Sequence, residues 1–135
     1  MFFLSHHHPD ALHRCYRIGS VWLCARCVGL YVGMFVTFAI QVTLAMPLFF
    51  ALDPTFAVLL TLPSLVDWAI GQFWPRASSN LVRSTTGALL GVALGRTLFV
   101  HFHTPFPIAL KLQMILVTAM ALAVILISYT RRVVR

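Results

Sequence analysis

Residues 106–129 read FPIALKLQMILVTAMALAVILISY, and the only charged side chain among them is Lys111. An α-helix needs about 20 apolar residues to cross the roughly 30 Å hydrocarbon core of a bilayer. Three further stretches meet that requirement: from about Val28 to Phe50, from Phe56 to about Phe73, and from about Val82 to Phe102. The sequence therefore predicts an all-α integral membrane protein, built as a bundle of four transmembrane helices.

The composition of the whole chain agrees with this fold class. Of its 135 residues, 60% are hydrophobic and 10% are charged, and the mean hydropathy is +0.90. Soluble domains have about 45–50% apolar and about 25% charged residues. Proline and small polar residues, which are typical of helix ends, separate the predicted spans within residues 53–54, 74–80 and 103–105. We expect one transmembrane domain, residues 28–135, after a short N-terminal cytoplasmic segment with Cys and His, residues 1–27.

The basic residues orient the predicted helices. Lys and Arg in short loops are retained on the cytoplasmic side of a membrane. Most of the ten basic residues precede the first span, flank the turn between the second and third, or follow the fourth: Arg14, Arg17, Arg26, Arg76, Arg83, Arg131, Arg132 and Arg135. We therefore predict a multi-pass protein of the cell membrane with both termini in the cytoplasm. This distribution argues against nucleic-acid binding despite a formal net charge of +7, because nucleic-acid binders carry their basic residues on a soluble face.

Glycines recur every four residues on two of the predicted helices. Gly87, Gly91 and Gly95 do so on the third, and Gly29 and Gly33 on the first. In lipid, helices associate through close packing of small residues. We expect both stripes to lie at helix–helix contacts.

Three cysteines lie close together before the first predicted span, namely Cys15 and the pair Cys24 and Cys27. The reducing cytosol disfavours a structural disulfide. With one histidine, the three thiolates make a tetrahedral set of the kind that zinc prefers. His13 is the nearest fourth ligand, and the competing ligands are His6, His7 and His8. Two alternatives are a redox dithiol and cysteines that serve only as small apolar residues.

A second group of polar residues surrounds the turn between the second and third predicted helices: Asp67, Gln72, Arg76, Ser79, Asn80, Arg83 and Thr86. An ionisable residue within a span is costly and marks a candidate site. We expect Asp67 to pair with Arg83 or Arg76. The arginine forks, beside a helix N-terminus, are suited to an anionic head group. The alternative is that Asp67 and one arginine only lock the two helices together.

Several motifs of the chain resemble a known family. They are His7-His8-Pro9, His13-Arg14-Cys15-Tyr16, Cys24-Ala25-Arg26-Cys27-Val28-Gly29-Leu30-Tyr31, residues 67–72, Arg83 and residues 86–91. Over about residues 5–96 they resemble an uncharacterised membrane family, domain-of-unknown-function family 2085. The resemblance implies a small multi-pass protein and no established activity. The commoner upstream pattern of that family is Cys-His-Gln where this chain has His-Arg-Cys, so the fourth metal ligand stays open.

A weaker resemblance covers residues 67–95. The spacing of Asp67, Gln72 and an arginine, a serine-rich turn and Gly-Ala-Leu-Leu-Gly are similar to the VanZ-like membrane proteins linked to glycopeptide resistance. This resemblance implies cell-envelope lipid or glycan chemistry. The acidic residue that follows the turn in that family is absent here.

These features predict a cytoplasmic-face metal site, with zinc as the expected metal, beside a cationic pocket for an anionic lipid or a phosphate-bearing ligand. If the protein is an enzyme, the metal would polarise a phosphoryl or carbonyl oxygen, Arg76 and Arg83 would hold the charge, and an unpaired Asp67 would act as the general base. The alternative function is a membrane thiol redox or metal-sensing protein. A transporter ranks last, because few polar residues lie within the spans. The sequence decides neither the substrate nor the oligomeric state.

Overall fold

Long helices make up most of the computed structural model, which describes residues 9–48, 51–74 and 78–133. Four of the helices in this part of the chain are long and apolar enough to cross a membrane, so the predicted all-α transmembrane class is confirmed. The elements in chain order are a short 3-10 helix, two strands and the four helices: η1 (Pro9–Arg14), β1 (Cys15–Ile18), β2 (Val21–Cys24), α1 (Ala25–Thr43), α2 (Asp53–Phe73), α3 (Asn80–His103) and α4 (Ile108–Val133).

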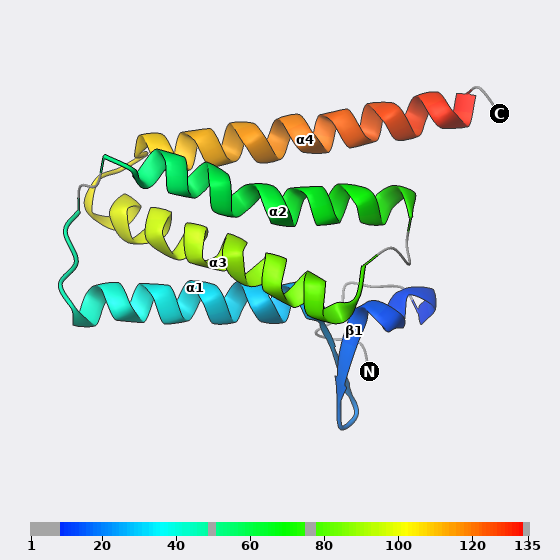
Figure 1. Cartoon of the computed structure of the whole chain (residues 1–135), viewed down its shortest axis with the longest axis horizontal. Coiled ribbons are helices and arrows are strands. Elements are labelled where there is room, and N and C mark those ends of the chain that lie inside the picture. The colour runs from blue at the N-terminus through cyan, green and yellow to red at the C-terminus, as the bar shows by residue number, and fades with distance from the viewer. Residues whose placement is uncertain (1–8, 49–50, 75–77, 134–135) are drawn as a thin grey trace.

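The helices lie side by side in the order α1, α3, α2, α4 (Figure 1). The α3 helix packs against both α1 and α2, and α4 packs mainly against α2. An even number of crossings returns the chain to the end from which it started. The start of α1 and the end of α4 accordingly lie at the same end of the row, which we call the N-terminal end (Figure 1).

The two glycine stripes lie at a helix–helix contact, as predicted, and the structure shows that this contact joins α1 and α3. A Cβ atom on Gly33 would lie 2.5 Å from the carbonyl oxygen of Ala88, and one on Gly95 would lie 2.7 Å from that of Met34. Real Cβ atoms do not approach a backbone oxygen so closely. The helices therefore pack backbone against backbone at these positions, which is the packing that small residues allow in lipid.

The second and third breaks between helices fall where proline and polar residues predicted them, whereas the first falls before the predicted residues 53–54. Pro54 lies in the first turn of α2, where a missing N–H costs no helical hydrogen bond. Ser79 caps α3, because its Oγ accepts a hydrogen bond of 3.3 Å from the backbone N–H of Val82. The α1 helix ends at Thr43, earlier than the predicted Phe50. It is followed by Ala45 with a φ of 47° and by Pro47, neither of which continues a helix.

The N-terminal segment contains a β-hairpin that the sequence analysis did not predict. Strands β1 and β2 are antiparallel, with Ile18 opposite Val21 and a two-residue turn between them. The first turn residue, Gly19, has a φ of 60°, the conformation that a type II′ hairpin turn needs at that position. The α1 helix begins at Ala25, so residues 25–27 of the predicted N-terminal segment form its first turn.

Candidate functional site

The hairpin and the start of α1 gather the three cysteines. Cys15 and Cys24 lie directly opposite each other across β1 and β2, and both are buried. Cys27 follows one turn into α1, where its thiol lies within hydrogen-bonding range of the Cys24 side chain. No disulfide joins these cysteines, all of which lie in the described part of the chain. We call these three thiols the cysteine cluster.

The histidines that were predicted to complete a metal site do not join this cluster in the described residues. His13, at the end of η1, is exposed, and His6, His7 and His8 lie outside the described residues. Within residues 9–48, 51–74 and 78–133, no group of three or more His, Cys, Asp or Glu side chains is arranged to hold a metal ion. The zinc site therefore stays a prediction.

Hydrogen bonds hold the N-terminal segment on the ends of α2 and α3. The guanidinium of Arg14 donates to the carbonyl oxygen of Gly71 at 3.2 Å, and the Asn80 amide donates to that of Cys15 at 3.2 Å. The hydroxyl of Ser84 lies 3.0 Å from both the Tyr16 hydroxyl and the Ala25 carbonyl oxygen. The cysteine cluster and the polar residues of α2 and α3 thus lie at one end of the molecule.

Asp67 forms an ion pair with Arg26, a partner that the sequence analysis did not name. Arg76 lies outside the described residues. Arg26 reaches α2 by passing Gly87 of α3, where a Cβ atom would lie 3.2 Å from its Cγ. Because Gly87 has no side chain, Arg26 can extend past α3 to the Asp67 carboxylate. Such a contact depends on how the helices pack and cannot be predicted from local sequence spacing. The predicted general-base role required an unpaired Asp67, and the ion pair removes that condition.

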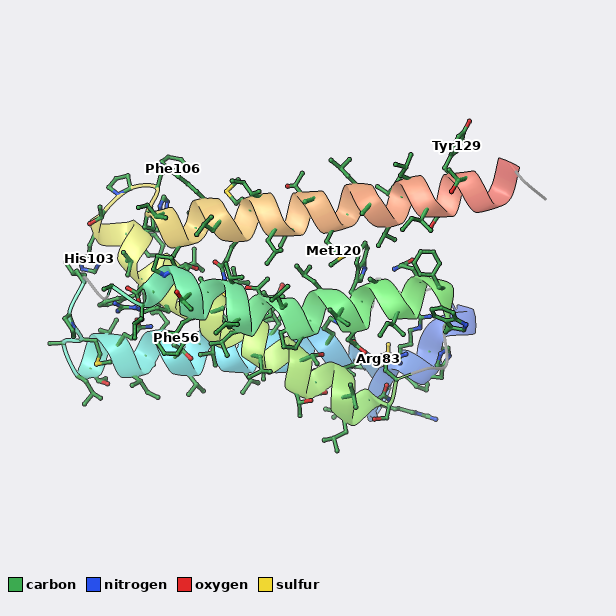
Figure 2. All side chains as sticks on the ribbon, turned by 45° about the horizontal axis from the view of Figure 1, so that its top comes forward. Phe56, Arg83, His103, Phe106, Met120 and Tyr129 are labelled. Carbon is green, nitrogen blue, oxygen red and sulfur yellow. The ribbon has the colours of Figure 1, made fainter. Side chains whose placement is uncertain are left out.

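Three arginine side chains line one cavity of about 250 Å³ at this end of the row: Arg14, Arg26 and Arg83, together with Cys24, Trp68, Gly71 and Gln72. We call it the arginine pocket. Arg83, labelled in Figure 2 near the start of α3, is buried, with 4% of its surface exposed. The side chain of Arg26 is 23% exposed. None of the described residues that line the pocket carries a carboxylate.

The predicted ligand-binding residues divide into two sets. Gln72 and Arg83 line the arginine pocket, and Asp67 bounds it through Arg26. Asn80 orients its neighbours, since its side-chain oxygen lies 3.5 Å from the Arg83 guanidinium. Thr86 does not contribute, because its hydroxyl donates to the Val82 carbonyl oxygen of its own helix at 2.9 Å.

Two arginines of the pocket were missed as ligand-binding residues. Arg14 and Arg26 were read only as signals of topology. Their position beside the cysteines, in His13-Arg14-Cys15 and Cys24-Ala25-Arg26-Cys27, was the available signal. Because Arg14 and Arg26 adjoin these cysteines in the chain, a fold that places the thiols at the ends of α2 and α3 also places the two guanidinium groups there.

A second ion pair lies at the opposite end of the row. The guanidinium of Arg96 donates to both carboxylate oxygens of Asp53, at 2.9 and 2.8 Å, and to the Gln41 side-chain oxygen at 3.0 Å. Deeper in the row, Gln113 bridges Thr97 of α3 and Thr61 of α2 at 2.9 and 3.0 Å. These contacts satisfy the polar groups within the spans by joining helices.

A family model described as "Predicted membrane protein (DUF2085)" matches residues 13–97. The chain belongs to this family. The match covers the hairpin, α1, α2 and most of α3, so the cysteine cluster and the arginine pocket of this DUF2085 chain both lie inside it, and α4 lies outside it. No curated protein and no solved structure matches the chain, and none of these comparisons shows the weaker resemblance to VanZ-like proteins.

Proposed function

We propose that the arginine pocket binds a phosphate-bearing anion, either the head group of an anionic lipid or a soluble phosphate compound. One observation carries the proposal. Three guanidinium groups line a single cavity, and the Asp67 carboxylate beside them is bound to Arg26. An anion in the cavity would offset the repulsion between the arginines, which is strong where surrounding side chains exclude water.

The donors suit phosphate better than a simple halide. Arginine presents a planar fork of N–H groups that matches the oxygens of phosphate or carboxylate, and Gln72 adds an amide. Trp68 supplies an apolar wall. This combination fits a ligand with a charged head and a less polar body.

We propose that the pocket faces the cytoplasm. Basic residues are retained on the cytoplasmic side, and Arg14, Arg17, Arg26 and Arg83 lie at the N-terminal end of the row, whereas Asp53 lies at the other end. Soluble phosphate compounds are abundant on that side. This orientation supports the proposed ligand class, and cysteine labelling of intact cells tests it.

The first experiment removes one arginine and asks which source of phosphate binds. The purified protein in nanodiscs of phosphatidylcholine is titrated with inorganic phosphate by calorimetry, and its retention of phosphatidylglycerol is measured by native mass spectrometry. We expect Arg83→Gln to lower the affinity for whichever ligand binds, phosphate or phosphatidylglycerol, by about tenfold or more. The reason is that a charge-assisted hydrogen bond contributes about 1.5–3 kcal/mol.

The matched control is Lys111→Gln. It removes one exposed cation near the start of α4, away from the pocket. Binding of phosphate alone would identify a soluble ligand, and binding of phosphatidylglycerol alone would identify a lipid head group. If neither binds, or if both variants weaken binding equally, the arginine pocket is not the site.

We propose, secondly, that the cysteine cluster holds zinc. Cys15 and Cys24 lie opposite each other and Cys27 lies in the first turn of α1. The three thiols would have to close up around the ion as ligands, with the fourth from His13 or one of His6 to His8. Sites rich in thiolate are usually structural. Because Cys24 also lines the arginine pocket, a metal there would fix one wall of the anion site, and its removal would loosen that wall.

Elemental analysis tests the metal. Protein purified without chelator is compared with Cys24→Ser/Cys27→Ser, and we expect about one zinc per wild-type chain and none in the variant. Alkylation separates this function from a redox dithiol. Protection of the thiols that a chelator abolishes supports zinc, whereas protection that a reductant abolishes would replace zinc by a disulfide.

A further inference from the structure

The β-hairpin extends from the start of α1 across the direction of the helix axes, away from α2 and α4 (Figure 1). The last residue of β2, Cys24, directly precedes Ala25, the first residue of α1. A strand joined without a linker to the end of a transmembrane helix lies at the depth of the membrane surface. Because it runs sideways from α1, which lies at the edge of the row, its tip lies over lipid and not over other helices.

The hairpin has one apolar face. Side chains alternate between the faces of a strand, and the register places Tyr16, Ile18, Val21 and Leu23 on the same side. At the tip, Ile18 is 64% exposed and Val21 is 40% exposed. In water, this pair would be an unfavourable exposed patch at the far end of a small hairpin.

The opposite face carries residues that favour a membrane surface. Arg17 and Trp22 lie directly opposite each other, with the Arg17 guanidinium carbon 5.7 Å from the centroid of the Trp22 ring. Tryptophan is enriched where apolar chains meet head groups. Arginine covers an apolar surface with its methylene groups and keeps its charge at the lipid phosphates.

We propose that the hairpin is an interfacial anchor, which inserts Ile18 and Val21 into the leaflet on the N-terminal side of α1 and holds Trp22 and Arg17 among anionic lipid head groups. The partner is the bilayer itself, which is continuous with the lipid around α1. The proposal is independent of the arginine pocket, because Arg17 and Trp22 do not line that cavity.

Fluorescence of the full-length protein measures the depth of the hairpin. The chain has three tryptophans, so Trp68→Phe/Trp74→Phe leaves Trp22 alone. The protein is placed in nanodiscs containing phosphatidylglycerol and lipids that carry a nitroxide near the head group or near the end of the chain. We expect blue-shifted Trp22 emission, stronger quenching by the shallow label than by the deep one, and protection from acrylamide.

Two matched variants test the role of the tip. Ile18→Ser/Val21→Ser should remove most of the lipid quenching of Trp22. The control Ile108→Ser/Val117→Ser makes the same change on α4, where the two residues are 65% and 42% exposed, and should leave the quenching unchanged. Arg17→Gln should reduce the difference between membranes with and without phosphatidylglycerol.

The result that overturns the proposal is Trp22 emission typical of water, quenched by acrylamide as fully as a free tryptophan derivative and not by either lipid label. The hairpin would then stand in water, where a protein partner is the remaining occupant. If the protein without Trp68 and Trp74 does not fold, the difference in quenching between the wild type and Trp22→Phe gives the same measurement.

Discussion

Asp67 is the residue on which the N-terminal end of the molecule depends most. It is 6% exposed, and its carboxylate is the counter-charge of Arg26 within the arginine pocket. Removing one partner of a buried ion pair leaves the other charge uncompensated, which costs more than the pair itself contributes. The residue therefore has a structural role whether or not an anion binds.

We expect Asp67→Asn to lower the free energy of unfolding by about 3 kcal/mol, a value typical of breaking a buried pair. The uncharged double variant Arg26→Gln/Asp67→Asn should recover part of that loss, because neither charge is then left alone. Thermal or denaturant unfolding in detergent measures both. Strictly additive effects of the two substitutions would contradict the ion pair.

At the scale of the elements, the contact of α1 with α3 determines where the arginines lie. The glycine stripes allow the two backbones to approach closely, and Arg26 crosses α3 at Gly87. A side chain added on either stripe would separate the helices and move Arg26 away from Asp67. The ion pair therefore depends on the close packing of α1 against α3.

Substituting a glycine tests this coupling. A Cβ atom on Gly91 would lie 2.8 Å from the backbone nitrogen of Met34, whereas one on Gly71 would meet nothing within 4 Å. We expect Gly91→Ala to destabilise the protein by about 1–3 kcal/mol, as overpacking does. Gly71→Ala, the control, should leave stability unchanged or raise it by up to about 1 kcal/mol, because alanine is the better helix former. Equal effects of the two substitutions in the unfolding measurement would show that the close approach is not needed.

Some elements of the fold could be predicted from the sequence, and others could not. The helices follow from apolar length, and their breaks follow from Pro54, Ser79 and similar local signals. The glycine spacing predicted which faces of α1 and α3 make helix contacts, but not that these two helices contact each other. The hairpin was missed although Gly19-Ser20 between two β-favouring runs was a usable signal. The partner of Asp67 could not be predicted, because it depends on which helices are neighbours, and a row in the order α1, α3, α2, α4 is a tertiary property.

At the scale of the whole molecule, the charges divide the protein into two ends. Arg14, Arg17, Arg26 and Arg83 lie at the N-terminal end, and the cysteine cluster lies among them. The other end holds the ion pair of Arg96 with Asp53. The account of function depends on the first of these ends facing the cytoplasm, where thiols stay reduced and phosphate compounds are available.

Cysteine labelling of intact cells tests this orientation most directly. New cysteines are introduced as Ser79→Cys at the N-terminal end and Thr104→Cys at the opposite end, both at exposed positions, and the cells are treated with a membrane-impermeant maleimide. We predict that Thr104→Cys is labelled from outside, and that Ser79→Cys is labelled only after the cells are permeabilised. Labelling of Ser79→Cys on intact cells, with Thr104→Cys protected, would place the arginine pocket and the thiols outside and contradict the account.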